Sequence, residues 1–134
     1  MLVHAKEAPR TRLLVVEDDR DLNEFIGRAA RERGCKVTSA YTGEDALEVL
    51  RESSIDWLLT DIRLPGSISG WLVGSEFGLS HPLRPVIYIS GVEPDSSQRR
   101  VGNSLFLYKP VETADLIILF ERLGIRAERA RALP

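Results

Sequence analysis

Residues suited to metal and phosphate chemistry occur at four places in this 134-residue sequence, each directly after a short apolar run. They are Glu17-Asp18-Asp19, Asp61, Ser90 and Lys109. Carboxylates gathered at one site repel one another, so such a site favours a divalent cation. Mg²⁺ suits it, because this ion prefers oxygen ligands and needs only one or two carboxylates, with a carbonyl and waters completing the octahedron.

Asp61 is the residue that we expect to react, because an aspartate carboxylate is a competent nucleophile toward phosphorus. The acyl phosphate that would form needs its charge balanced by a metal ion, an ammonium group and a hydroxyl group. We expect Asp18 and Asp61 to bind the metal, Lys109 to supply the ammonium and Ser90 to supply the hydroxyl. Taken singly, each has a plainer interpretation. The acidic run at 17–19 could start a helix and Asp61 could be a turn residue, while Ser90 could be a loop hydroxyl and Lys109 a solvated surface charge.

The elements that must position these residues alternate between short apolar runs and segments with helical periodicity, which is typical of a parallel sheet covered by helices. Strands are predicted at residues 13–16, 36–40, 55–60, 86–89 and 105–108. Helices are predicted at residues 21–33, 42–50, 71–79, 93–103 and 112–123, the fourth being short and polar. Right-handed crossovers then give an α/β, flavodoxin-like three-layer sandwich, a five-stranded parallel sheet in the order 2-1-3-4-5 with a shortened fourth helix. Ligands bind at the carboxyl ends of the strands in such sheets, so the four polar sites should converge.

Composition limits the class of protein. The chain has the size of one domain, and its formal charge of −2 comes from 18 basic and 20 acidic residues. That balance lacks the basic excess of a nucleic-acid or anionic-membrane surface, so we predict no direct nucleic-acid binding and no membrane association. Cys35 is the single cysteine, which excludes an intrachain disulfide and favours the cytoplasm. His4 and His81, like Cys35, lack partners at catalytic spacing and are interpreted as structural or incidental.

The chain divides into three parts. Residues 1–11 are predicted to be a flexible N-terminal segment, and Met1 with this polar stretch favours a natural start. Residues 12–123 are predicted to form the folded domain. Residues 124–134 are predicted to be a tail that contains helix-forming residues but little apolar surface, so that its helix would fray or depend on a partner.

Over roughly residues 12–123 the sequence resembles the receiver domains of two-component response regulators. The likeness lies in LLVVEDD at 13–19, LTDIRLPG at 59–66, ISG at 89–91 and FLYKP at 106–110. The resemblance implies that Asp61 is phosphorylated, and that Glu17 and Asp18 form an acid pocket. It further implies that the Arg63 carbonyl completes a Mg²⁺ site.

The resemblance also implies that Ser90 and Phe106 act as switch residues. It implies a signalling phosphoacceptor, not an enzyme with a separate substrate, that takes its phosphoryl group from a histidine kinase or histidine phosphotransfer protein. An unidentified output protein would read its state through protein contacts, and the receiver would be a cytoplasmic monomer or weak dimer. The sequence differs from the usual pattern in a shorter, polar segment between Ser90 and Lys109, in Ser90 where threonine is commoner and in Phe106 where tyrosine is usual. The short segment predicts an altered output surface, and the exposed side chain expected at Arg63 predicts slow self-dephosphorylation.

Three other functions stay open at this point. The chain is alternatively a receiver module detached from a hybrid sensor kinase. A Mg²⁺-dependent phosphohydrolase that uses Asp61 as nucleophile is less favoured, since such enzymes usually carry an aspartate two residues further on, where this sequence has Arg63. A flavodoxin-like cofactor carrier is also less favoured, because acidic residues follow the first strand in place of a phosphate-binding loop.

Overall fold

A computed structural model of the chain describes residues 10–91 and 104–125. The strands are β1 (Arg12–Val16), β2 (Lys36–Ala40), β3 (Trp57–Asp61), β4 (Val86–Ser90) and β5 (Ser104–Tyr108). The helices are α1 (Arg20–Arg31), α2 (Gly43–Glu52), α3 (Gly70–Ser80) and α4 (Thr113–Arg122). The short helix predicted at 93–103 lies outside the described residues, as do residues 1–9 and 126–134 of the two predicted terminal segments.

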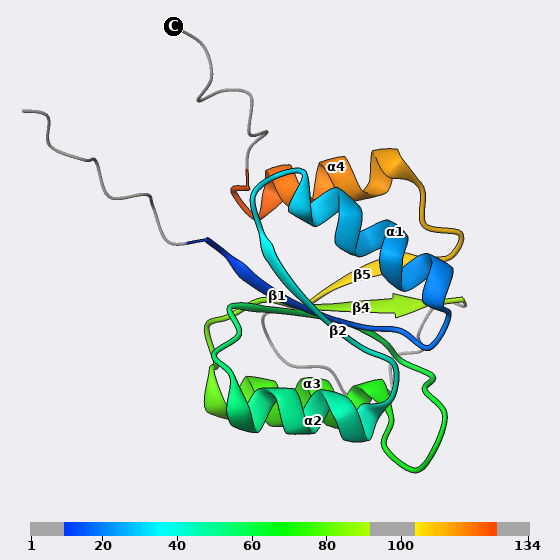
Figure 1. The fold of residues 1–134 in the computed structure, drawn as a ribbon, viewed down its shortest axis with the longest axis vertical. Helices are drawn as coiled ribbons and strands as arrows, with labels where there is room; N and C mark the ends of the chain where they lie inside the picture. Colours follow the sequence, from blue (N-terminus) through cyan, green and yellow to red (C-terminus); the bar gives the residue numbers. More distant parts are fainter. Residues whose placement is uncertain (1–9, 92–103, 126–134) are drawn as a thin grey trace, which may run out of the picture.

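The five strands form one parallel sheet in the order β2-β1-β3-β4-β5, which confirms the predicted fold class. Figure 1 shows α1 and α4 on one face of the sheet and α2 and α3 on the other. Side chains of β1 alternate between the two faces, as a strand requires. Leu13 and Val15 pack with α1 and α4, whereas Leu14 and Val16 pack with α2 and α3.

Capping side chains start three of the helices close to the carboxyl ends of the strands. Asp19, Thr42 and Ser69 accept hydrogen bonds from backbone N–H groups in the first turns of α1, α2 and α3, which satisfies donors that the helix itself leaves unpaired. The third strand differs from the prediction, since it ends at Asp61 and not at Thr60. Asp61 stays in the strand because it pairs with Ile89 of β4.

The helix α3 extends one residue beyond the predicted range at each end. Its two interior glycines, Gly74 and Gly78, each lower helix propensity by about 1 kcal/mol relative to alanine. At Gly74 the reason is packing, because a Cβ there would overlap the phenol of Tyr88 in β4. None of the helices in the described part of the chain has the length and apolar character that crossing a membrane requires.

Candidate functional site

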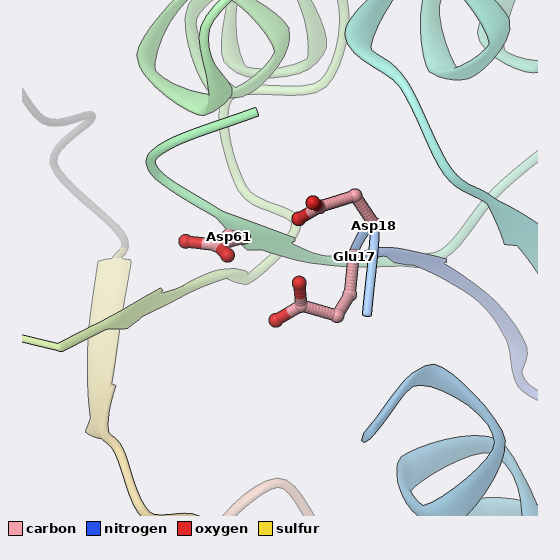
Figure 2. Close-up of side chains that lie close together, drawn as sticks. All are labelled: Glu17, Asp18 and Asp61. Atoms are coloured by element: carbon pink, nitrogen blue, oxygen red, sulfur yellow. The ribbon is translucent and has the colours of Figure 1, made fainter. Parts of the chain in front are cut away.

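Three carboxylates meet where β1 and β3 end (Figure 2). Glu17 and Asp18 directly follow β1, and Asp61 is the last residue of β3, the neighbouring strand. One oxygen from each carboxylate lies within 4.8 Å of the others. Glu17 and Asp61 are buried, whereas Asp18 is exposed, so the cluster opens to solvent on the Asp18 side.

Lys109 joins this cluster from the end of β5. Its Nζ lies 2.9 Å from Asp61 Oδ2 and 3.0 Å from Glu17 Oε1. Burial lowers the pKa of Lys109, but the hydrogen bond to Asp61 and the charge of Glu17 outweigh it and raise the pKa above its ordinary value. The ammonium therefore stays protonated and supplies one positive charge against the three carboxyl groups.

The Glu17 carboxyl is fully buried, and this burial raises its pKa to about 7. The backbone N–H of Asp19, which donates to Glu17 Oε2 at 3.1 Å, opposes the rise, and the neighbouring charge of Asp61 adds to it. The other oxygen, Oε1, lies near the Lys109 ammonium but makes no hydrogen bond of suitable angle to any described residue. A buried carboxylate oxygen with unused acceptor capacity, beside two further carboxylates, fits the ligand preference of Mg²⁺.

Asp61 is held from both sides. Its Oδ2 accepts from the Lys109 ammonium, and its Oδ1 accepts from the backbone N–H of Arg63 at 3.1 Å. The Arg63 side chain is exposed. These two bonds hold the carboxylate in one orientation, and a nucleophile held in one geometry loses less entropy when it reacts.

Ser90 is the last residue of β4, directly after Ile89, which pairs with Asp61 in the sheet, and it is buried. Its carbonyl accepts from the backbone N–H of Lys109 at 2.8 Å, which ties the ends of β4 and β5 together. The structure thus brings Glu17, Asp18, Asp61 and Lys109 into direct proximity. It places Ser90 beside them through the backbone.

Phe106 lies in a cluster of aromatic side chains behind the site. Its ring centroid is 5.5 Å from that of Tyr88 and 6.2 Å from that of Trp71, and these two are 4.6 Å from each other. The Phe106 ring also stacks on Tyr108, with centroids 6.4 Å apart. The predicted switch residue therefore contacts the first turn of α3 and the exposed end of β5.

Two residues at the site are not among those singled out from the sequence. Asn23 of α1 is buried and hydrogen-bonds three carbonyl oxygens near the acidic residues, and Gly70 begins α3 against the backbone of Asp61. The signal for Asn23 is present in the sequence, since an asparagine stands on the helix stripe whose next members, Ile26, Gly27 and Ala30, are buried. A polar residue on an apolar stripe indicates a specific buried partner.

Comparison with known proteins gives the same family throughout. A model described as "Response regulator receiver domain" matches residues 13–121. The transcriptional regulatory protein CssR of Bacillus subtilis (strain 168) is 32% identical over 114 residues, which are 83% of this chain and 50% of that protein. The response regulator receiver protein CpdR of Brucella abortus (strain 2308) is 31% identical over 121 residues, which are 87% of this chain and 98% of CpdR. The chain thus spans about half the length of CssR and nearly all of CpdR.

The solved structures agree with the sequence comparisons. The crystal structure of a response regulator receiver protein from Sinorhizobium medicae WSM419 superposes with a TM-score of 0.78 at 29% identity. The superposition covers 85% of this chain and 94% of that one.

Proposed function

Since this chain belongs to the response regulator receiver family, we propose that it is the phosphoacceptor of a two-component phosphorelay and is phosphorylated on Asp61. The observation that carries the proposal is the position of Asp61, a buried carboxylate 2.9 Å from the Lys109 ammonium and within 4.8 Å of two further carboxylates. The donor would be a histidine kinase or a histidine phosphotransfer protein. We also propose that the exchange takes place in the cytoplasm, which the free thiol of Cys35 supports.

In the proposed reaction, a carboxylate oxygen of Asp61 forms a bond to phosphorus while the phosphorus–nitrogen bond of the donor phosphohistidine breaks. The electron pair of that bond returns to the imidazole nitrogen, which takes up a proton. Lys109 is already at Asp61 and can transfer its contact to an oxygen of the incoming phosphoryl group. The hydroxyl of Ser90, at the end of the adjacent strand, would donate to a second oxygen.

Asp18, Asp61 and the carbonyl of Arg63, with Glu17 beside them, are the groups proposed to hold Mg²⁺. Bound there, the ion would balance the negative charge that gathers as a phosphoryl group approaches three carboxylates. The protein's own part is to hold Asp61 by its two hydrogen bonds and to keep Glu17 away from solvent.

We propose that the protein passes on its phosphorylation state by contacting another protein. The outer surface of β5 and α4 exposes Tyr108, Ile117 and Ile118, with 48%, 45% and 61% of their area accessible. Phe106 lies in the same strand and stacks on Tyr108, so a change at Ser90 and Phe106 would reach this surface. The same arrangement would serve a receiver that forms part of a hybrid sensor kinase, which remains the alternative.

The proposal is tested by incubation with Mg²⁺ and acetyl phosphate, followed by intact mass measurement. We expect one added phosphoryl group that is absent from Asp61→Asn and absent when the metal is chelated. Asp56→Asn is the matched control, because Asp56 is also a strand-flanking aspartate but pairs with Arg12 away from the cluster. A wild-type protein that gains no mass, or an Asp61→Asn variant that gains as much as the wild type, would overturn the assignment. Hydrolysis of small phosphate esters with turnover would favour the phosphohydrolase instead.

A further inference from the structure

The side chain of Asn23 ties together the carboxyl ends of two strands. Its Nδ2 donates to the carbonyl oxygens of Glu17 at 3.0 Å, Ala40 at 3.1 Å and Val15 at 3.4 Å. Val15 lies in β1 and Glu17 directly follows that strand, whereas Ala40 is the last residue of β2. Asn23 itself is only 1% exposed.

The orientation of this amide is fixed by its surroundings. Turning it over would place Oδ1 against three carbonyl oxygens, none of which can donate. In the orientation observed, Oδ1 is buried and has no hydrogen-bond partner within the described part of the chain. Burying an acceptor without a partner costs stability, and an apolar residue at this point of the α1 stripe would avoid that cost. We therefore infer that residue 23 is an asparagine because its Nδ2 group donates these hydrogen bonds, and not only because a side chain of this size fits there.

The hydrogen bonds of Asn23 hold the backbone at the start of the acidic segment, residues 17–19. Glu17 is held through its carbonyl by Asn23 and through its N–H by the carbonyl of Ala40 at 3.1 Å. Asp19 is held through its N–H by the Glu17 carboxylate and caps α1 with its own side chain. Asp18 stands between these two residues, so the anchors on either side fix the position of its backbone, from which its exposed carboxylate projects.

We propose that Asn23 is a positioning residue for the divalent-cation site: it fixes the carbonyl of Glu17 and thereby aims the Asp18 carboxylate at the space shared with Asp61. The inference rests on the proposed function for the identity of the cation, and its own content is that the affinity for that cation depends on Asn23. It is distinct from a purely structural role, which would alter the free energy of unfolding without altering metal affinity.

The test is calorimetric titration of Mg²⁺ alone into the wild type and into Asn23→Leu, whose side chain has the same branched shape and number of heavy atoms but no donor. We expect the Kd for Mg²⁺ to rise about tenfold or more, the usual effect of removing a group that orients a metal ligand. With acetyl phosphate as donor, the Mg²⁺ concentration for half-maximal phosphorylation should rise by the same factor, and the rate at saturating Mg²⁺ should stay close to that of the wild type. Ile26→Val, a substitution of a buried core residue one turn along α1 that leaves the Asn23 amide in place, is the control and should leave the Kd unchanged.

Asn23→Ala provides a second variant, because the space it opens is lined by carbonyl oxygens and can take a water. A folded Leu or Ala variant with the wild-type Kd overturns the inference. A wild type that binds no Mg²⁺ also overturns it. Ile26→Ala, which removes more of a buried side chain, serves as the folding control: if both Asn23 variants unfold under conditions where Ile26→Ala stays folded, Asn23 is a structural residue and the inference is overturned. If the wild type binds Mg²⁺ more tightly than the variants but never gains a phosphoryl group, the proposed function fails and the positioning role of Asn23 stands.

Discussion

A Cβ atom on Gly70 would overlap the carbonyl oxygen of Asp61. The helix α3 begins directly against the end of β3, and the N–H of Gly70 donates to the carbonyl of Ile62 at 2.9 Å. The residue that carries the reactive carboxylate and the residue that starts the next helix are therefore in backbone contact, which only glycine permits.

Gly70→Ala should consequently lower the free energy of unfolding by about 1–3 kcal/mol, the usual range for overpacking, and should slow the phosphorylation of Asp61 because its backbone must move. Gly27→Ala is the matched control. A Cβ there meets Val37 Cγ1 at 3.4 Å, an ordinary contact, and the substitution lies in the interior of α1. It should raise the stability by about 0.5–1 kcal/mol. Urea denaturation measures both, and equal effects of the two substitutions would contradict the backbone contact.

Lys109→Met tests the charge balance of the cluster. Removing the ammonium leaves Glu17 and Asp61 without their cationic neighbour, which should destabilise the metal-free protein. The loss should be about 1–2 kcal/mol, less than the 3–5 kcal/mol of a fully buried pair, because 33% of the Lys109 side chain is exposed. Mg²⁺ should then bind more tightly than to the wild type, since it becomes the sole neutralising charge. Thermal unfolding with and without Mg²⁺ should therefore show a larger stabilisation by the ion in the variant. An equal or smaller shift would argue against a cation at this cluster.

The pKa of about 7 at Glu17 predicts how Mg²⁺ binding depends on pH. In the metal-free protein the folded state keeps a proton that the unfolded chain releases near pH 4.5, so the contribution of Glu17 to stability falls as the pH rises from about 4.5 to about 7 and then levels off. A cation competes with that proton. The Kd for Mg²⁺ should therefore fall as the pH rises through 7, with release of a proton on binding. Calorimetry in two buffers of different ionisation enthalpy measures the released proton, and Glu17→Gln should abolish it.

Much of the fold follows from the sequence, because the apolar runs that form strands and the polar residues that end them can be recognised locally. The runs at residues 13–16 and 86–89 are confirmed as strands, and the order of the parallel sheet follows from general rules of chain crossing. Since parallel strands bring their carboxyl ends to one edge, the meeting of Asp61 with Lys109 was also predictable. The predicted end of β3 is one residue early, at Thr60 and not at Asp61, since an aspartate after an apolar run looks locally like a turn.

What the sequence leaves out are quantities set by tertiary surroundings. Glu17 and Asp18 are neighbours with similar side chains, yet one is fully buried with a raised pKa and the other is exposed. Nothing in their sequence context separates them. The contacts of Asn23 with β2 and of Gly70 with Asp61 likewise depend on how the helices dock on the sheet, which local patterns do not specify.

The ion pair between Arg12 and Asp56 gives a prediction away from the site. Arg12 Nη2 lies 2.9 Å from Asp56 Oδ1, and this side-chain bonding holds the pKa of Asp56 below its usual value. Its stabilising contribution is then present above the unfolded pKa of about 3.9 and is lost as the pH falls through the lower folded value. Asp56→Asn should lower the urea midpoint at pH 7, and the difference from the wild type should vanish in acid. Glu48→Gln, which alters an exposed carboxyl of α2, should show no such difference.

The last prediction concerns Arg63, whose backbone and side chain have separate roles. Its backbone N–H holds Asp61 Oδ1, whereas its exposed side chain is free to lie over a phosphoryl group formed there. Arg63→Ala keeps the first contact and removes the second, so phosphorylation by acetyl phosphate should proceed at the wild-type rate while the acyl phosphate hydrolyses severalfold faster. Intact mass followed over time after removal of the donor measures the lifetime, with Arg51→Ala, an exposed arginine of α2, as the control. If the lifetime is unchanged in Arg63→Ala, the side chain does not shield the phosphate from water, and the slow hydrolysis expected of this receiver must come from the burial of Asp61 itself.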